Sequence, residues 1–353
     1  MECIFDPGRS FYLGLLENGG DLVPEERARR RVLRPRPGRL ERWLGKGGGP
    51  LRGFLRYVRY SLLLQWLIWR LRPRVVVTVC LEAMIAGCFT CKLGAVWLGS
   101  VGSDNHEVLR REHTRFQPIL QKLLGLVYRR PDFMIAASGG LKDVLSREFG
   151  VPTERIEVIH NPVDVERVRA RSAEPLQEEG FLLGVGRLIE VKGFELLLRA
   201  LARVPGTDLV LLGEGAQRNY LETVAAELSI SRRVRMPGYE ENPWKYMKRA
   251  ALVVVPSLSE GFSNVLAEAL AAGACVVASD CPHGPKEIVR NGIEARMVPA
   301  GDVPALAEAI GELLNDAPAR ERLRRAAAER AWEFDVSAIG PRYLQFLDRV
   351  GQG

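Results

Sequence analysis

Short apolar runs recur along most of the chain, with polar or amphipathic stretches between them. The runs are residues 75–79, 95–98, 133–137, 156–159, 181–185, 209–212, 252–255 and 275–278. Several of the intervening stretches have the periodicity of amphipathic helices, at residues 119–128, 141–149, 194–203 and 217–228. Strands that are apolar throughout are typical of parallel sheets covered by helices on both faces. The pattern therefore predicts an α/β protein built on parallel sheets.

The alternation is interrupted at residues 160–164, whose sequence is HNPVD, and the polar segment 166–180 follows. A chain of 353 residues is long enough for two domains of ordinary size. We therefore place a first domain at residues 1–160 and a second at residues 161–335.

The charge balance favours an anionic partner, because the formal net charge is +7. Arginines crowd residues 27–59, and over residues 51–71 they interleave with apolar side chains such as Trp66 and Trp69. This pattern predicts a basic amphipathic helix that lies on an anionic membrane surface. The alternative is a solvated helix whose aromatic residues pack on its own domain. Nucleic acid is a weaker candidate, because no recognised binding module accompanies the charge.

The cysteines and histidines do not indicate a redox or metal centre. Cys88 and Cys91 have the spacing of a redox motif, but their segment is rich in Ala, Gly and Leu and predicts a buried helix. No second cysteine pair completes a zinc site and the histidines are scattered, so we expect no metal. Six cysteines without a secretory leader indicate reduced thiols and a cytoplasmic location. No apolar segment is long enough to span a bilayer.

The stretch 256–268 contains the strongest candidate for a binding site. An apolar run before it predicts a buried strand, and the Leu- and Ala-rich segment 265–272 predicts a helix that ends at Gly273. Ligands of open α/β sheets lie beyond the carboxyl ends of the strands, where free N–H groups of a helix start can bind a phosphate. Glu268 suits a diol such as a ribose, because two carboxylate oxygens can accept two hydroxyl protons. The alternative is that Glu260 and Glu268 serve only the helix dipole.

A second loop places cations at the same edge of the sheet. Residues 184–193 follow the first strand of the second domain and contain Arg187 and Lys192. Two cations that flank a turn can bind a diphosphate, the arginine by a fork of donors and the lysine as a point charge. The alternative is a pair of solvated surface cations. Glycine turns at residues 213–215 and 236–239 would let a ligand approach the backbone, although each turn alone is weak evidence.

Taken together, these loops resemble the donor site of glycosyltransferase family 4. The resemblance covers about residues 73–335: segment 160–164 is similar to the linker of the family, and Glu260 and Glu268 are similar to its pair of donor-site glutamates. Residues 279–288 resemble the branch that transfers N-acetylhexosamine to lipid-linked acceptors. The resemblance implies the GT-B fold of two Rossmann-like domains facing across a cleft, retention of anomeric configuration, and no metal requirement. It also implies that residues 336–353 form a helix that crosses back to the first domain.

The same resemblance gives roles to individual residues. Arg187 and Lys192 would hold the donor diphosphate and stabilise the charge that develops as it leaves. Glu268 would bind the ribose hydroxyls, and Glu260 would contact the sugar or the edge of its phosphate. The remaining donor-site candidates are the residues of the turns, namely Gly186, Gly238, Gly261, Phe262, Ser263 and Asn264.

The first domain would supply the acceptor side. Asp104 and His106 follow the strand at residues 95–98 and are the candidates for contact with the acceptor or the transferred sugar. The alternative is a polar loop that caps the following helix. The family opens with a strand and a Gly-Gly-rich turn, and residues 1–10 contain neither, so we expect the first strand of this domain to be missing or reduced.

These observations predict a retaining glycosyltransferase that moves a sugar, best matched by N-acetylhexosamine, from a UDP-sugar to a glycan acceptor. The expected acceptor is a polyprenyl-diphosphate-linked or other precursor glycan, and the expected location is the cytoplasmic face of the membrane, as a peripheral protein. One alternative is a UDP-sugar epimerase on the same scaffold, which would form product without an acceptor. The other is a non-catalytic protein that binds sugar nucleotides.

Overall fold

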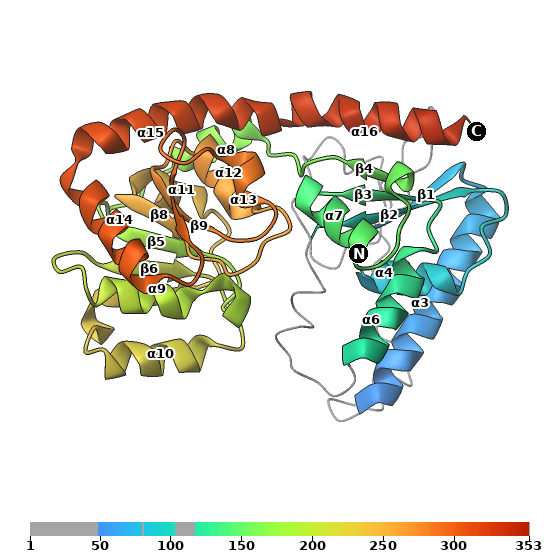
Figure 1. Ribbon diagram of the computed structural model, residues 1–353, viewed down its shortest axis with the longest axis horizontal. Helices are drawn as coiled ribbons and strands as arrows, with labels where there is room; N and C mark the ends of the chain where they lie inside the picture. The colour runs from blue at the N-terminus through green and yellow to red at the C-terminus, as the bar shows by residue number, and fades with distance from the viewer. Residues whose placement is uncertain (1–48, 80, 103–116, 353) are drawn as a thin grey trace.

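The computed structural model describes residues 49–79, 81–102 and 117–352. In these residues, two separate parallel sheets lie side by side, each between helices (Figure 1). The prediction of an α/β protein with parallel sheets is therefore confirmed. Residues 1–10, where the sequence lacks the expected first strand, lie outside the described residues.

The first sheet has four strands in the order β1-β2-β3-β4, and every neighbouring pair is parallel. Their bounds are β1 Val75–Val79, β2 Val96–Val101, β3 Phe133–Ala136 and β4 Ile156–Val158. Apolar side chains point to both faces of this sheet, so each face needs a cover. Strand β2 continues to Val101, three residues past the predicted end, because its last residues still pair with β3.

The second sheet has six parallel strands in the order β10-β9-β8-β5-β6-β7. Their bounds are β5 Leu182–Val185, β6 Leu209–Leu212, β7 Val234–Gly238, β8 Leu252–Val255, β9 Val276–Asp280 and β10 Arg296–Pro299. Leu182 of β5 pairs with Leu209 of β6 on one side and with Leu252 of β8 on the other. The strand order therefore reverses between β5 and β8, and open α/β sheets bind their ligands outside the carboxyl ends of such strands.

The helices fill the connections and cover the sheets. In the first half they are α3 Gly49–Leu71, α4 Leu81–Cys88, α6 Gln117–Tyr128 and α7 Gly139–Arg147. In the second half they are α8 Val165–Ser172, α9 Phe194–Leu201, α10 Arg218–Glu227, α11 Trp244–Arg249, α12 Asn264–Ala271, α13 Pro285–Ile288, α14 Val303–Asn315, α15 Ala317–Arg330 and α16 Val336–Gly351. Helices α9, α10 and α14 pack on one face of the second sheet, and α8, α11 and α12 pack on the other (Figure 1).

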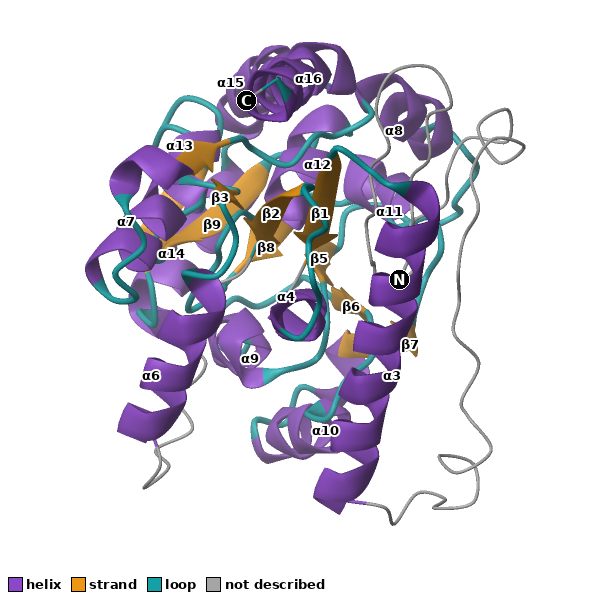
Figure 2. Cartoon of the chain, turned by 90° about the vertical axis from the view of Figure 1, so that its right-hand side faces the viewer, coloured by secondary structure: helices purple, strands orange, loops and turns teal. Residues whose placement is uncertain are grey.

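Helix α16 packs on the first sheet, although it is the last helix of the chain. Its residues Ile339, Phe346, Leu347 and Val350 form one buried cluster with Val75, Leu98, Ile135 and Ile159. Helices α3, α4 and α6 cover the opposite face of that sheet, with α4 between the other two (Figure 2). No helix of the described residues is long and apolar enough to cross a membrane.

The strands that the apolar pattern missed are both at the edges of the second sheet. Along β7, Val234 and Met236 alternate with exposed residues, and β10 begins with Arg296 and ends with Pro299. An edge strand has only one neighbour and is less buried, so it does not need a continuous apolar run. Interior strands such as β6 and β8 have all of their residues buried and match the predicted runs.

Candidate functional site

A pocket of about 960 Å³ opens at the point where the strand order of the second sheet reverses. Its walls come from the ends of β5, β6 and β7, from α8, and from the helix that follows β8. Gly186, Arg187, Asn264 and Glu268 are the predicted site residues that line it. The pocket is therefore where the rule for open α/β sheets predicts a ligand.

The glycine turns bring three strand ends close together. Gly186 N–H donates to the carbonyl of Leu212, and Gly213 N–H donates to the carbonyl of Gly238. A Cβ on Gly213 would lie 1.9 Å from the carbonyl oxygen of Gly186, so no other residue fits there without moving the backbone. Gly238 itself does not line the pocket, but the next residue, Tyr239, does.

Arg187 extends from the end of β5 as an exposed side chain. Among the described residues, no hydrogen bond or ion pair holds its guanidinium group. A guanidinium group at a pocket wall presents a fork of donors that matches the oxygens of a phosphate. Arg187 is thus available to an anionic ligand.

Lys192 is placed differently from Arg187. It ends a short 3₁₀ helix, Glu190–Lys192, and its Nζ lies 2.7 Å from Glu260 Oε1. Ser257 Oγ donates to the same oxygen, also at 2.7 Å, and the Glu260 side chain is only 8% exposed. Lys192 and Glu260 are both predicted donor-site residues, and they form an ion pair with each other, but neither side chain lines the pocket. The Lys192 stem lies 3.8 Å from the position of a Cβ on Gly186, so the pair is next to the pocket wall.

Glu268 is on α12 and faces the pocket. Trp244, the first residue of α11, donates its Nε1–H to Glu268 Oε2 at 3.1 Å. Burial raises the pKa of the Glu268 carboxyl, and the hydrogen bond from Trp244 lowers it by less. Nearby, Asn161 Nδ2 of the linker donates to Asn264 Oδ1 at 2.9 Å.

The remaining residues of the turn after β8 contact the first domain. A Cβ on Gly261 would lie 2.4 Å from the carbonyl oxygen of Gly102. Phe262 is buried, and its ring stacks on His160 with 5.5 Å between centroids. Ser263 precedes α12 in extended conformation, and its buried Oγ has no hydrogen-bond partner among the described residues.

The remaining predictions concern the acceptor-side residues, the cysteine pair and metal binding. Asp104 and His106 lie outside the described residues. Cys88 and Cys91 are both free thiols, one at the end of α4 and one beyond it. In the described part of the chain, no cluster of three or more His, Cys, Asp or Glu residues could hold a metal ion.

Sequence reasoning missed one wall of the pocket. Arg167 and Arg171 on α8 line it, as do Trp244 and the acids Glu240 and Glu241. The two arginines lie one helical turn apart and immediately follow the HNPVD linker, and this spacing could have placed them on one face of a helix. Trp244 has no comparable signal, because a single tryptophan at a helix start is more often a packing residue.

Comparison with known families agrees with this geometry. The model described as Glycosyltransferase Family 4 matches residues 18–167, and the one described as Glycosyl transferases group 1 matches residues 166–330. Each model matches a little under half of the chain, and both describe glycosyltransferases, so the chain is a glycosyltransferase whose two halves resemble these two families. These matches confirm the resemblance found in the sequence.

Curated relatives and solved structures are also similar to this chain. It is 31% identical, over 66% of its length, to an N-acetylgalactosamine-N,N'-diacetylbacillosaminyl-diphospho-undecaprenol 4-alpha-N-acetylgalactosaminyltransferase of Campylobacter jejuni. It is 33% identical, over 62% of its length, to the lipopolysaccharide core biosynthesis glycosyltransferase LpsE of Rhizobium meliloti. The matches span 64% and 65% of these relatives, so the chain covers a little under two thirds of each.

The solved structures bear on the fold of the chain. Sucrose-phosphate synthase from Thermosynechococcus elongatus matches with a TM-score of 0.75 at 22% identity, covering 94% of this chain and 86% of that one. Anabaena HepE in complex with UDP-glucose matches with a TM-score of 0.72 at 22% identity, covering 82% of each chain. These likenesses confirm the predicted GT-B fold.

Proposed function

We propose that this protein transfers a sugar from a UDP-sugar to a lipid-linked glycan, with retention of anomeric configuration. The families that its two halves resemble support the reaction class. The Campylobacter jejuni relative is named for transfer of N-acetylgalactosamine to a diphospho-undecaprenol glycan, which supports an N-acetylhexosamine donor and a polyprenyl-diphosphate acceptor. A single observation carries the proposal: one pocket holds an arginine that follows β5, unpaired among the described residues, and a carboxylate from α12.

Each wall of the pocket has a task in this proposal. Arg187 binds the diphosphate of the donor and stabilises the charge that grows on it as the sugar leaves. The Glu268 carboxylate accepts hydrogen bonds from the ribose hydroxyls. Next to the pocket wall, the ion pair of Lys192 and Glu260 joins the segment after β5 to the turn after β8, at the end where the sugar lies.

The reaction then needs no covalent intermediate on the protein. The bond from the anomeric carbon to the UDP oxygen breaks, and the acceptor oxygen bonds to the same face of that carbon. The proton of the acceptor hydroxyl passes to the departing diphosphate, so charge and atoms balance. The cations and the helix starts around the diphosphate favour its departure by stabilising negative charge.

The acceptor side of the proposal concerns the first domain. A polyprenyl-diphosphate glycan is anchored in a membrane, so the enzyme must work at its surface. We assign this contact to the exposed apolar face of α3 and α6, and we place the protein at the cytoplasmic side as a peripheral protein. Asp104 and His106 stay proposed acceptor contacts.

The test is a donor screen that measures release of UDP from several UDP-sugars, with and without short polyprenyl-diphosphate glycans. We expect release to depend on the acceptor and to be fastest with a UDP-N-acetylhexosamine. Glu268→Gln should reduce the rate at low donor concentration by about 10- to 100-fold, because a hydrogen bond to a charged acceptor is worth about 1.5–3 kcal/mol.

Glu308→Gln is the matched control, since Glu308 is an exposed residue of α14 on the opposite face of the sheet. Product formed without any acceptor would indicate an epimerase. Binding of UDP with no turnover of any donor would indicate a non-catalytic binding protein. Either result contradicts the proposal.

A further inference from the structure

Trp244 connects two neighbouring helices at the wall of the pocket. It is the first residue of α11, it lines the pocket, and its Nε1–H donates to Glu268 Oε2 on α12 at 3.1 Å. Within the described part of the chain, Trp244 is the one residue that donates a hydrogen bond to the Glu268 side chain. The orientation of the carboxylate therefore depends on the position of the indole ring.

The bond from Trp244 leaves the carboxylate able to bind a diol. A carboxylate has about four lone-pair sites on its two oxygens, and the indole N–H occupies one of them. With Oε2 held, rotation of the carboxylate is restricted, and Oε1 is left without a donor among the described residues. A vicinal diol donates two protons with fixed separation, so it gains from an acceptor pair that is already oriented.

The indole ring is itself held by cations from α8. The guanidinium carbon of Arg167 lies 5.8 Å from the ring centroid of Trp244, and that of Arg171 lies 5.6 Å from it. A guanidinium group within about 6 Å of an indole centroid is attracted by the ring. These contacts connect α8, which follows the interdomain linker, to the start of α11.

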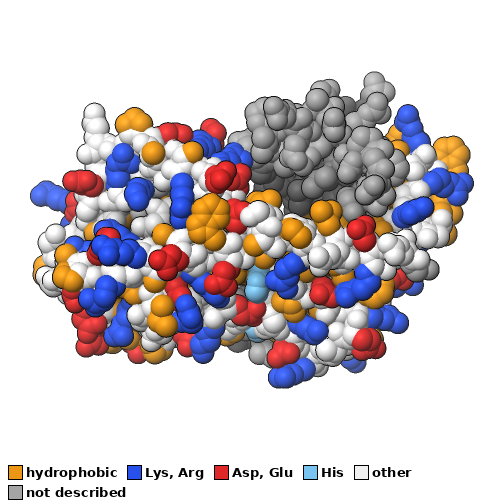
Figure 3. All heavy atoms as spheres, turned by 90° about the horizontal axis from the view of Figure 1, so that it is seen from above, with side chains coloured by type: hydrophobic (Ala, Val, Ile, Leu, Met, Phe, Trp, Pro, Cys, Tyr) orange, Lys and Arg blue, Asp and Glu red, His pale blue; other side chains and the backbone are white. Residues whose placement is uncertain are grey.

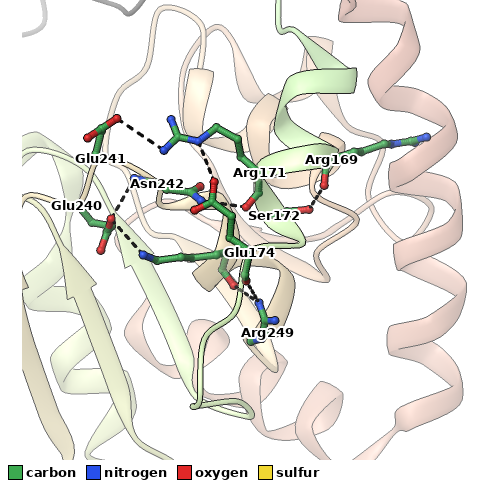
Figure 4. Close-up of polar contacts among 9 residues, drawn as sticks. Arg169, Arg171, Ser172, Glu174, Glu240, Glu241, Asn242 and Arg249 are labelled. Atoms are coloured by element: carbon green, nitrogen blue, oxygen red, sulfur yellow. Dashed lines mark hydrogen bonds and ion pairs between the residues drawn. The ribbon is translucent and has the colours of Figure 1, made fainter.

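A network of polar contacts fixes the end of α8 that carries Arg171 (Figure 4). Arg171 Nε lies 3.3 Å from Glu174, and its second terminal nitrogen lies 3.6 Å from Glu241. Asn242 Nδ2 donates to the carbonyl of Arg171 at 2.9 Å, and Arg249 donates to the carbonyl of Glu174 at 2.9 Å. Asn242 precedes Trp244 in the sequence and Arg249 follows it, so contacts to the end of α8 hold the chain on both sides of Trp244.

We infer that Trp244, held in place by Arg171, makes the pocket prefer a ribonucleotide to a 2′-deoxyribonucleotide by orienting Glu268 toward both ribose hydroxyls. Trp244 is a positioning residue here, since it acts through Glu268. The inference rests on the proposed function, because it takes the ligand of Glu268 to be the ribose of a nucleoside diphosphate. It goes further by naming the residue that determines whether the pocket prefers a nucleotide with ribose to one with 2′-deoxyribose.

The test measures the dissociation constants of UDP and 2′-deoxy-UDP by calorimetry. The wild-type protein should bind UDP at least about tenfold more tightly than 2′-deoxy-UDP, because only UDP donates two hydrogen bonds to the ionised carboxylate. Trp244→Phe should reduce this ratio to about threefold or less, mainly by weakening UDP. Arg171→Met, which keeps the stem and removes the charge, should reduce the ratio to an intermediate value.

Trp332→Phe is the matched control. Trp332 is a half-exposed tryptophan with Arg169 over its ring at 5.0 Å, and it does not line the pocket. This variant should keep the wild-type ratio. Equal weakening of both nucleotides by Trp244→Phe, or an unchanged ratio in both Trp244→Phe and Arg171→Met, overturns the inference. A wild-type protein that binds neither nucleotide contradicts the proposed function instead, so the two failures can be told apart.

Discussion

Glu260 and Glu268 both follow strand β8, but their carboxyl groups have different surroundings. Glu260 is paired with Lys192 and accepts a hydrogen bond from Ser257, so the protein already neutralises its charge. In the described part of the chain, Glu268 has one donor, the indole of Trp244, and burial raises its pKa. Burying a carboxylate with so few donors costs free energy that a ligand with hydroxyl groups can recover. At the scale of single residues, Glu268 is thus the better candidate for direct ligand contact.

The raised pKa of Glu268 predicts how nucleotide binding depends on pH. Hydroxyl donors favour the ionised carboxylate, so UDP affinity should be full above the pKa of Glu268 and fall as the pH drops through it. Because burial raises this pKa, the fall should begin above the ordinary value of 4.5. Calorimetric titrations with UDP between about pH 5 and 8 measure the effect.

The nucleotide itself also titrates, since the second pKa of a phosphate ester is about 6. Glu268→Gln separates the two effects, because this variant lacks the carboxylate while the diphosphate of its ligand still titrates. The acid loss of affinity should be steeper in the wild-type protein than in this variant. Parallel curves for the two proteins would show that Glu268 stays ionised throughout.

At the scale of elements, a short helix of the second domain caps a helix of the first. Glu287 of α13 accepts hydrogen bonds from the N–H groups of Gly139 and Gly140, the first residues of α7, at 3.0 and 3.2 Å. His160 Nε2 of the linker lies 3.0 Å from the same carboxylate. A negative charge at a helix N-terminus is favourable, because it binds free N–H groups and faces the positive end of the dipole. Glu287 therefore joins three parts of the chain.

Removal of this cap should both destabilise the protein and open the domains. Glu287→Ala should lower the free energy of unfolding by about 1 kcal/mol, the usual cost of losing an N-terminal cap. It should also increase the radius of gyration measured by small-angle X-ray scattering. Urea denaturation measures the first effect.

Asp302→Ala is the matched control, since Asp302 caps α14 within the second domain through the N–H of Ala305. It should destabilise the protein comparably without a change in the radius of gyration. If Glu287→Ala leaves the radius unchanged, the cap stabilises α7 without holding the domains together. Burial raises the pKa of Glu287, but its hydrogen bonds outweigh burial and lower it, so the stabilisation is complete above pH 4.5 and is lost at lower pH.

The elements also show what local sequence pattern can predict. Continuous apolar runs located the interior strands β6 and β8, because burial on both faces requires them. The edge strand β7 was missed, since its burial alternates. Arg187 and Glu268 were placed in one pocket because strand ends meet at one edge of a sheet. The hydrogen bond from Trp244 and the cap by Glu287 depend on how helices and domains pack against one another. The local pattern of apolar and polar residues does not determine that packing.

The whole molecule distributes its apolar surface unevenly. On the face that carries α15 and α16, acidic and basic side chains intermix and apolar ones occur in small groups (Figure 3). In the first domain, α3 and α6 each expose a row of large apolar side chains at helical spacing. The rows are Val58, Leu62, Trp66 and Trp69 on α3, and Ile119, Leu123 and Leu126 on α6. Basic residues lie beside them, among them Arg70, Lys122 and Arg129.

An apolar row beside basic residues is typical of a helix that binds the surface of an anionic membrane. We expect the protein to sediment with vesicles that contain phosphatidylglycerol and to bind neutral vesicles much more weakly. Leu62→Glu should reduce this binding several-fold, because Leu62 is 67% exposed and its side chain would enter the interface.

Leu344→Glu is the control, since Leu344 is a similarly exposed leucine on α16, which packs on the opposite face of the first sheet from α3. It should bind vesicles as the wild-type protein does. Equal loss in both variants would point to a general effect of added negative charge. Unchanged binding of Leu62→Glu would exclude the α3 row as the contact surface.

The position of α16 determines the order in which the two domains complete their folding during translation. Val75, Leu98, Ile135 and Ile159 of the first sheet are covered by a helix that the ribosome makes only after the second domain. Throughout translation of the second domain, this apolar face of the nascent sheet lacks the cover that α16 later provides, and transiently exposed apolar surface makes partly made chains prone to aggregation. The earlier domain in the sequence is therefore the later one to finish folding, and premature termination of translation just before α16 leaves both domains made but only one complete.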